Sequence, residues 1–260
     1  MKHLSSKKNQ EVKAWKKLQT AKGRRLANQY MIEGWHLVEE AILASQQISL
    51  IMVEEAMIEE VGQRLPQIVS YEYEQVSISR EIVEELSNTP SPQGIFAVID
   101  MQVKDVRMDN VEQDSRWILL DGIQDPGNMG TIIRTADAAG YDGIVLGSGC
   151  VDVYNDKVIR STQGSLWHLS IIEKPLAEVI RLLQNHQVKV YAAALDDSAL
   201  SYREIDHQHS QAYIIGNEGQ GISAEILAMA DQTVYIPMKG QAESLNAGIA
   251  ASILMFLSIS

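Results

Sequence analysis

Apolar and polar positions alternate along the first hundred residues with the spacing of short helices and strands. Helical spacing is typical of residues 9–18, 34–44 and 79–86, and short apolar runs predict strands at 27–33, 50–53 and 94–99. Ser79 stands where a side-chain cap would open the last of these helices. The pattern predicts a small α/β domain over residues 1–100, and the polar stretch 101–115 is typical of a linker.

Residues 116–260 predict a second α/β domain. Its apolar runs favour strands, and helical patterns separate them. The expected strands are 117–120, 143–146, 188–194, 212–215 and 233–236. The expected helices lie near 128–139, 175–186 and 222–230. Strands that alternate with helices indicate a mainly parallel sheet covered on both faces. The last apolar stretch, 247–257, fits either a core helix or one half of a dimer interface.

Composition excludes several classes of protein. A chain of 260 residues with 45% hydrophobic and 22% charged residues is typical of a globular protein. The stretch 247–257 is too short to span a bilayer, and the N-terminus has no apolar core of a signal peptide. A single cysteine, Cys150, excludes an intrachain disulfide and a cysteine-based zinc cluster. We therefore expect a cytoplasmic protein without a membrane anchor or a metal.

The charge is distributed very unevenly. The net charge is −12, yet residues 1–30 hold nine of the 22 basic residues and only one of the 34 acidic residues. A basic arm on an acidic body is expected where one end of a protein meets phosphates. A solvated, partly disordered tail would show the same composition, and the charge pattern alone does not separate the two.

The first sequence with candidate chemistry follows the strand at 117–120. Pro126 and Gly127 break the strand, and a helix then carries Asn128 near its start and Arg134 opposite its isoleucines. Helical side chains lean toward the N-terminus, so Arg134 could extend back over Gly130 toward Asn128. Open α/β sheets bind ligands at this end of their strands. The alternatives are an asparagine that only caps the helix and an arginine on a solvated face.

A second strand ends in Gly216-Asn217-Glu218-Gly219-Gln220-Gly221. The glycines follow the spacing GxxGxG, which differs from the GxGxxG of dinucleotide-binding folds, and no Lys-Ser/Thr pair of a phosphate loop follows. NAD and ATP are therefore not indicated. Glycines let the backbone approach a ligand closely, and Glu218 adds a carboxylate that could instead complement a helix N-terminus.

A third strand ends at Pro237 and leads through a loop to the apolar stretch 247–257. Three polar residues, Glu243, Ser244 and Asn246, precede this stretch. Ser244 or Asn246 can open the helix as an ordinary N-cap.

Together these three turns resemble the motifs of the SpoU (TrmH-like) branch of the SPOUT RNA methyltransferases. The matching residues, in the family's order, are Asn128-x-Gly130-x-x-x-Arg134, Gly216-Asn217-Glu218-Gly219-x-Gly221, and Ile236-Pro237-Met238 with Ser244-Leu245-Asn246. The first half is similar to the substrate-binding domain often attached to this branch, which resembles a fold of certain ribosomal proteins. Its matching stretches are Ser6-x-x-Asn9-x-x-Val12-Lys13, Glu33-Gly34-x-x-Leu37-Val38-Glu39-Glu40 and Pro92-Gln93-Gly94.

The resemblance implies a trefoil-knotted, parallel-sheet methyltransferase domain over 116–260, preceded by an RNA-binding domain over 1–100. It implies S-adenosylmethionine as cofactor, RNA as substrate, a homodimer, and methylation of a ribose 2′-hydroxyl, with ribosomal RNA favoured over transfer RNA. The cofactor residues it implies are Gly216, Ile236, Met238 and Leu245. The catalytic residues it implies are Asn128, Arg134, Glu218, Ser244 and Asn246. One departure is that Ala247 and Gly248 stand where many relatives carry a β-branched residue and a serine.

In this family the arginine of the first motif is proposed to activate the ribose hydroxyl. A guanidinium has no acceptor, so we expect Arg134 to bind phosphate and stabilise alkoxide character rather than to take the proton. Asn128 would hold Arg134 or the ribose, and Glu218 and Ser244 would complete the polar ring. The alternatives are a non-catalytic RNA-binding protein with the same fold, and an oxidoreductase, which the missing GxGxxG disfavours.

Overall fold

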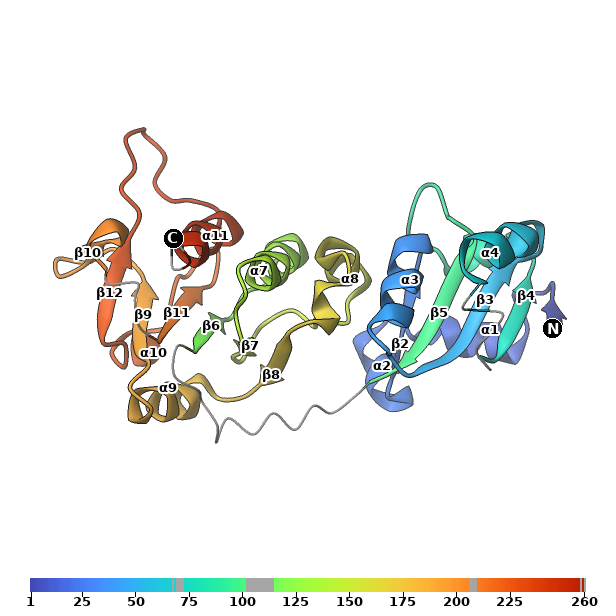
Figure 1. Cartoon of the computed structure of the whole chain (residues 1–260), viewed down its shortest axis with the longest axis horizontal. Helices are drawn as coiled ribbons and strands as arrows, with labels where there is room; N and C mark the ends of the chain where they lie inside the picture. The colour runs from blue at the N-terminus through green and yellow to red at the C-terminus, as the bar shows by residue number, and fades with distance from the viewer. Residues whose placement is uncertain (67, 69–72, 102–114, 206–209, 258, 260) are drawn as a thin grey trace. The chain divides into compact units, whose positions relative to one another are not determined.

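The computed structural model describes the chain except residues 67, 69–72, 102–114, 206–209, 258 and 260 (Figure 1). The chain forms two compact units. Unit 1 comprises residues 1–103 and 154–167, and unit 2 comprises residues 104–153 and 168–260. Most of the predicted linker, 101–115, lies outside the described residues.

Unit 1 is built on a mixed five-stranded sheet. Its strands are β1 (Lys2–Leu4), β2 (Gln29–Glu33), β3 (Ile48–Glu54), β4 (Gln75–Ile78) and β5 (Ile95–Asp100), in the order β1-β4-β3-β5-β2. Its helices are α1 (Gln10–Lys17), α2 (Ala21–Ala27), α3 (Trp35–Leu43), α4 (Ile58–Arg64), α6 (Arg80–Leu86) and α8 (Asp156–Thr162). Trp15, Phe96 and Ile82 belong to the core that α1 and α6 form against the sheet. The predicted small α/β fold is confirmed.

The basic N-terminal residues are part of this fold. Strand β1 pairs in parallel with β4, and Val12, Trp15 and Leu18 are buried. The alternative of a disordered tail is therefore wrong. The prediction of a Ser79 side-chain cap is also wrong, because its hydroxyl donates to the carbonyl of Ser5 at 3.2 Å instead.

A segment from the second half of the sequence completes unit 1. Trp167 Nε1 donates to the buried Tyr30 hydroxyl at 2.9 Å, and the rings of Tyr30 and Tyr154 lie 4.6 Å apart. His36 Nε2 lies 3.2 Å from the carbonyl oxygen of Gln163. The expected methyltransferase domain, 116–260, includes residues 154–167, but these contacts are with the first hundred residues.

Unit 2 contains a seven-stranded sheet in which all pairs are parallel, as predicted. Its strands are β6 (Arg116–Asp121), β7 (Gly143–Leu146), β8 (Ser170–Glu173), β9 (Lys189–Ala193), β10 (Leu200–Ser201), β11 (Gln211–Gly216) and β12 (Gln232–Tyr235), in the order β10-β12-β9-β11-β6-β7-β8. Its helices are α7 (Pro126–Ala138), α9 (Leu176–Asn185), α10 (Ala224–Leu227) and α11 (Ala247–Leu257). In Figure 1, α9 lies on one side of the sheet and α7 and α11 lie on the other. The implied knot stays a prediction.

The departure at Gly248 has a packing explanation. Gly248 is buried, and a Cβ added there would lie 3.3 Å from Cβ of Thr131 on α7. The hydroxyls of Thr135 and Ser252 lie 3.0 Å apart on the same two helices. A residue without a side chain at 248 therefore lets α11 approach α7 closely.

Among the described helices, none has the length and apolarity that crossing a bilayer requires.

Candidate functional site

Three turns of unit 2 meet at the carboxyl end of its sheet. The first turn (residues 122–125) follows β6, the second (217–222) follows β11, and the third (236–246) follows β12. Strands β6 and β11 are neighbours, while β9 separates β11 from β12. The fold therefore places the three sequence motifs where parallel sheets bind their ligands.

Glu218 joins the second turn to the first. Its carboxylate accepts from the backbone N–H of Gln124 at 3.2 Å and of Asp125 at 3.0 Å, and from Asn128 Nδ2 at 3.0 Å. Burial alone would raise the pKa of Glu218, but the hydrogen bonds from Asn128 and the backbone outweigh it and hold the pKa below its ordinary value. Glu218 is therefore anionic at neutral pH and fastens the start of α7.

Asn128 connects all three turns. Its side chain is buried, its Nδ2 donates to Glu218, and its Oδ1 accepts from Asn246 Nδ2 at 2.7 Å. Asn246 in turn accepts from the N–H of Ile249 at 3.1 Å, so Asn246 opens α11. The alternative that Asn128 caps its helix is wrong, because α7 begins at Pro126 and Asp125 Oδ1 accepts the N–H of Asn128 at 2.8 Å.

The second turn closes so tightly that it requires a glycine directly before it, at the end of β11. Backbone hydrogen bonds of 3.0 and 2.9 Å link Asn217 and Gly221 in both directions, and a Cβ on Gly216 would lie 2.3 Å from the backbone of Gly221. Asn217 Nδ2 also donates to the carbonyl of Gly122 at 2.7 Å. Asn217 and Asp125 are not among the expected site residues, although their side chains commonly stabilise turns of this kind.

Arg134 and Ser244 lie outside this hydrogen-bond network. Both are exposed, and neither makes a hydrogen bond or ion pair with a residue that the structure describes. The expected approach of Arg134 to Asn128 is not observed. An exposed guanidinium without a protein partner can bind an anion from outside the chain.

The third turn has features that suit a nucleoside ligand. Ile236 is half-buried, while Met238 and Leu245 are 40% and 36% exposed. Residues 237–245 make no hydrogen bond with the rest of the described chain, so backbone donors and acceptors lie beside apolar side chains. Such a combination matches a flat, mostly apolar body with a polar edge.

One further residue of this region was not predicted. Leu195 follows β9, the strand between the second and third turns, and is 80% exposed. A ligand that spans these turns would cross the carboxyl end of β9, next to Leu195. The only feature of the sequence that could have indicated Leu195 is an apolar residue directly after an apolar strand.

The described residues hold no group of three or more side chains suited to a metal ion.

Two family models match the chain. Residues 115–256 match the SpoU rRNA Methylase family, and residues 9–97 match the MRM3-like substrate binding domain. A similar curated protein is the 23S rRNA (guanosine(2553)-2′-O)-methyltransferase RlmP of Bacillus subtilis, which is 41% identical over 98% of each chain.

Solved structures agree over almost the whole chain. The AdoMet-bound rRNA methyltransferase from Sinorhizobium meliloti superposes with a TM-score of 0.88 at 29% identity and covers 99% of this chain and 97% of its own. The SpoU methyltransferase AviRb from Streptomyces viridochromogenes, in complex with AdoMet, gives a TM-score of 0.84 at 26% identity, with 96% and 97% covered. The chain therefore belongs to the SpoU rRNA methylase family, as its three joined turns predict.

Proposed function

We propose that the protein is an S-adenosylmethionine-dependent methyltransferase that modifies a ribose 2′-hydroxyl of ribosomal RNA in the cytoplasm. The observation that carries the proposal is the contact of Asn128 with Glu218 and Asn246, which joins the three motifs at one end of the sheet. The 41% identity with RlmP favours a guanosine of 23S rRNA as the target.

Gly216, Ile236, Met238 and Leu245 would hold the cofactor. Gly216 allows the second turn to close. The third turn has apolar side chains, and its backbone groups make no hydrogen bonds with the rest of the described chain. When bound, S-adenosylmethionine supplies an electrophilic methyl group.

The protein's own groups act on the nucleophile. Arg134 binds the RNA phosphate and stabilises negative charge that develops on the 2′-oxygen. Ser244 helps orient the ribose. Asn128, Glu218 and Asn246 act through position, because their hydrogen bonds fix the first turn against the second and third.

The direct test is methyl transfer by the full-length protein to 23S rRNA transcripts, followed by mapping of alkali-resistant ribose positions. We expect one 2′-O-methylated nucleotide and no methylated base. Tight RNA binding without any methyl transfer would favour the alternative of a non-catalytic RNA-binding protein.

RNA binding would use part of the basic N-terminal surface. Three lysines form ion pairs: Lys2 with Glu11, Lys7 with Glu81 and Lys16 with Glu85. Arg24 is buried and donates to the carbonyl of Leu18. The exposed basic residues whose side chains have no partner in the described part of the chain are Lys8, Lys13, Lys17, Lys22 and Arg25. These five define the basic surface.

Replacing Lys13, Lys17 and Lys22 with glutamine is expected to weaken binding to rRNA about tenfold or more at low salt. If all three contact phosphate, the slope of log affinity against log salt should also fall by about two to three. The matched control replaces the paired Lys2, Lys7 and Lys16, which changes the charge equally. Filter binding across a salt series compares them, and equal losses would contradict a role specific to the basic surface.

We also propose a homodimer through α11. Gly248, Ala251, Leu254 and Met255 are buried, whereas Ile249 and Phe256 are 49% and 47% exposed. Positions seven residues apart share one face of a helix, so these two form an apolar surface beside α7. A second copy of the chain would cover it.

The substitution Phe256→Glu is expected to convert the dimer into a monomer, because a charge in an apolar interface is costly to desolvate. Light scattering at micromolar concentration measures the mass. The control is Leu43→Glu, at a residue of α3 that is 64% exposed and outside this surface. A monomeric wild-type protein would contradict the proposal.

A further inference from the structure

Two sequence motifs of unit 1 that the proposed reaction does not use both position Trp35. One motif includes Gly34, and the other is Pro92-Gln93-Gly94. Trp35 is the first residue of α3, and its backbone N–H donates to Gln93 Oε1 at 2.9 Å. Gly34 has a φ of 107°, which residues with a side chain rarely adopt, and its N–H donates to the carbonyl of Ile95 at 3.0 Å. The start of α3 is therefore fixed against the turn that contains Gln93.

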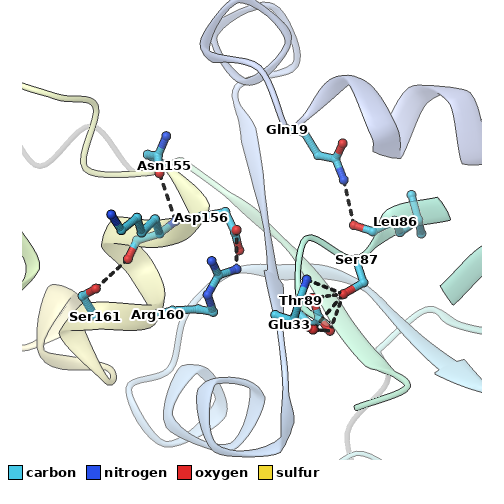
Figure 2. A network of polar contacts seen from close by, with 10 residues as sticks. Gln19, Glu33, Leu86, Ser87, Thr89, Asn155, Asp156, Arg160 and Ser161 are labelled. Atoms are coloured by element: carbon cyan, nitrogen blue, oxygen red, sulfur yellow. Dashed lines mark hydrogen bonds and ion pairs between the residues drawn. The ribbon is translucent and has the colours of Figure 1, made fainter. Parts of the chain in front are cut away.

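Glu33 holds the other end of the same loop, residues 87–94. Ser87 Oγ lies 2.9 and 2.8 Å from the two carboxylate oxygens of Glu33, and Thr89 Oγ1 lies 3.0 Å from one of them (Figure 2). Glu33 is the last residue of β2. The loop is thus fastened at both ends to the chain on either side of Gly34, and Trp35 is held in place before any ligand arrives.

Trp35 differs from the other three tryptophans of the chain. Trp15, Trp117 and Trp167 are buried, with exposed fractions of 8%, 6% and 8%. Trp35 is only half-buried. Tryptophan is enriched at binding interfaces, because covering its large ring with a partner is favourable. The exposure of this one tryptophan therefore indicates a binding residue.

Arg64, at the end of α4, lies over the Trp35 ring. Its Cζ is 4.3 Å from the ring centroid. Arg64 Nη1 donates to Glu60 Oε1 at 3.0 Å, one turn earlier on the same helix, and the Arg64 side chain is 55% exposed. The two planar groups, an aromatic ring and a guanidinium, are therefore both accessible to solvent in part. We call them the Trp35–Arg64 platform.

The charges around the platform disfavour phosphate. Glu60 already pairs with Arg64, and Glu39 and Glu59 are exposed on α3 and α4. These carboxylates repel an RNA phosphate, whereas the face of a base carries no net charge. The platform therefore suits a flat, neutral ring, unlike the basic surface, which suits phosphate.

We propose that the Trp35–Arg64 platform stacks an unpaired base of the substrate RNA, an assignment that rests on the proposed function. Bases of single-stranded RNA commonly stack on aromatic rings and on guanidinium planes. Stacking uses the face of a base and not its edges. The platform therefore recognises an unpaired nucleotide and tolerates any of the four bases.

The test measures binding of the full-length protein to two RNAs by fluorescence anisotropy across a salt series. One RNA is a twelve-nucleotide oligouridylate, in which every base is unpaired, and the other is a twelve-base-pair duplex. Trp35→Ala is expected to weaken binding to the oligouridylate about tenfold, as the loss of one stacked base allows. Binding to the duplex should be unchanged, because its bases are not free to stack. The slope of log affinity against log salt should also be unchanged, because no phosphate contact is lost.

Two further variants keep the test decisive if Trp35→Ala does not fold. Trp35→Phe retains an aromatic face and should bind the oligouridylate within about threefold of wild type, whereas Arg64→Ala should weaken this binding severalfold. Arg80→Ala is the matched control for Arg64→Ala and should have little effect. Arg80 is 52% exposed and pairs with Glu84, four residues away on α6, but it stacks on no aromatic ring of the described chain.

The outcomes separate stacking from its alternatives. Equal losses for the oligouridylate and the duplex, or a salt slope lowered by about one, would overturn stacking in favour of a phosphate contact. Unchanged binding by Trp35→Ala would show that the ring only packs against Arg64. Methylation of 23S rRNA by the wild-type protein, combined with that unchanged binding, would overturn the platform alone. Weakened oligouridylate binding by Trp35→Ala, without any methylation by the wild-type protein, would instead overturn the proposed function.

Discussion

Replacing Arg134 with alanine is expected to lower methyl transfer by a factor of about 10² to 10³ and to leave S-adenosylmethionine affinity nearly unchanged. Losing one preorganised group that stabilises developing charge commonly has this effect. Arg134 is exposed on α7, whereas the proposed cofactor residues lie at the end of β11 and on the third turn. Single-turnover methyl transfer and calorimetric cofactor titration measure the two quantities separately.

Two further variants show whether position and geometry matter. Arg181→Ala removes an exposed arginine from α9 and should leave the rate unchanged. Arg134→Lys should restore little activity, because an ammonium lacks the planar fork of a guanidinium. A wild-type rate in Arg134→Ala would show that Arg134 belongs to a solvated helix face.

Replacing Glu218 with alanine is expected to reduce both activity and stability. The variant removes the acceptor of the Gln124 and Asp125 N–H groups and of the Asn128 amide. We expect the free energy of unfolding to fall by about 1–3 kcal/mol, because water can replace part of these bonds at an exposed carboxylate. Methyl transfer should fall about 10²-fold, because the first turn loses its position relative to the other two. Denaturant unfolding and single-turnover rates measure the effects.

The pKa of Glu218 gives this prediction a pH dependence. Its folded-state pKa lies below the ordinary value of 4.5, so its carboxylate stabilises the fold fully above pH 4.5. That contribution is lost as the pH falls below 4.5 through the folded-state pKa. The difference in unfolding free energy between wild type and Glu218→Gln should therefore shrink between pH 6 and pH 3. Glu225→Gln on α10 is the control, and a difference that stays constant with pH would contradict the assignment.

Long apolar runs made much of the fold predictable. Such runs coincide with five strands of unit 2, namely β6, β7, β9, β11 and β12. The alternation of these runs with helical patterns indicated a parallel sheet. Strand β1 has only three residues and forms through pairing with β4, more than 70 residues away. Helix α2 contains the polar run Lys22-Gly23-Arg24-Arg25, so it has no apolar period to detect. These elements depend on tertiary contacts that a sequence window does not contain.

The residues of the site were predictable from the sequence, but the hydrogen bonds between them were not. The turn residues themselves showed where Asn128, Glu218 and Asn246 lie in the fold. Their hydrogen bonds join positions 90 and 118 residues apart, which no local spacing can indicate. Helix geometry favoured a contact between Arg134 and Asn128, but Glu218 and Asn246 bind the Asn128 amide instead.

The packing of residues 154–167 in unit 1 limits how this enzyme can be recombined with its relatives. A chimera joined only at residues 101–115 would combine Tyr30 from one parent with Tyr154 and Trp167 from the other. Trp167 and Tyr154 both contact Tyr30, which is buried, so a mismatched set should destabilise the fold of the substrate-binding half. Exchange of RNA specificity between relatives therefore requires two additional crossovers, one on each side of residues 154–167. This segment then comes from the same parent as the rest of unit 1.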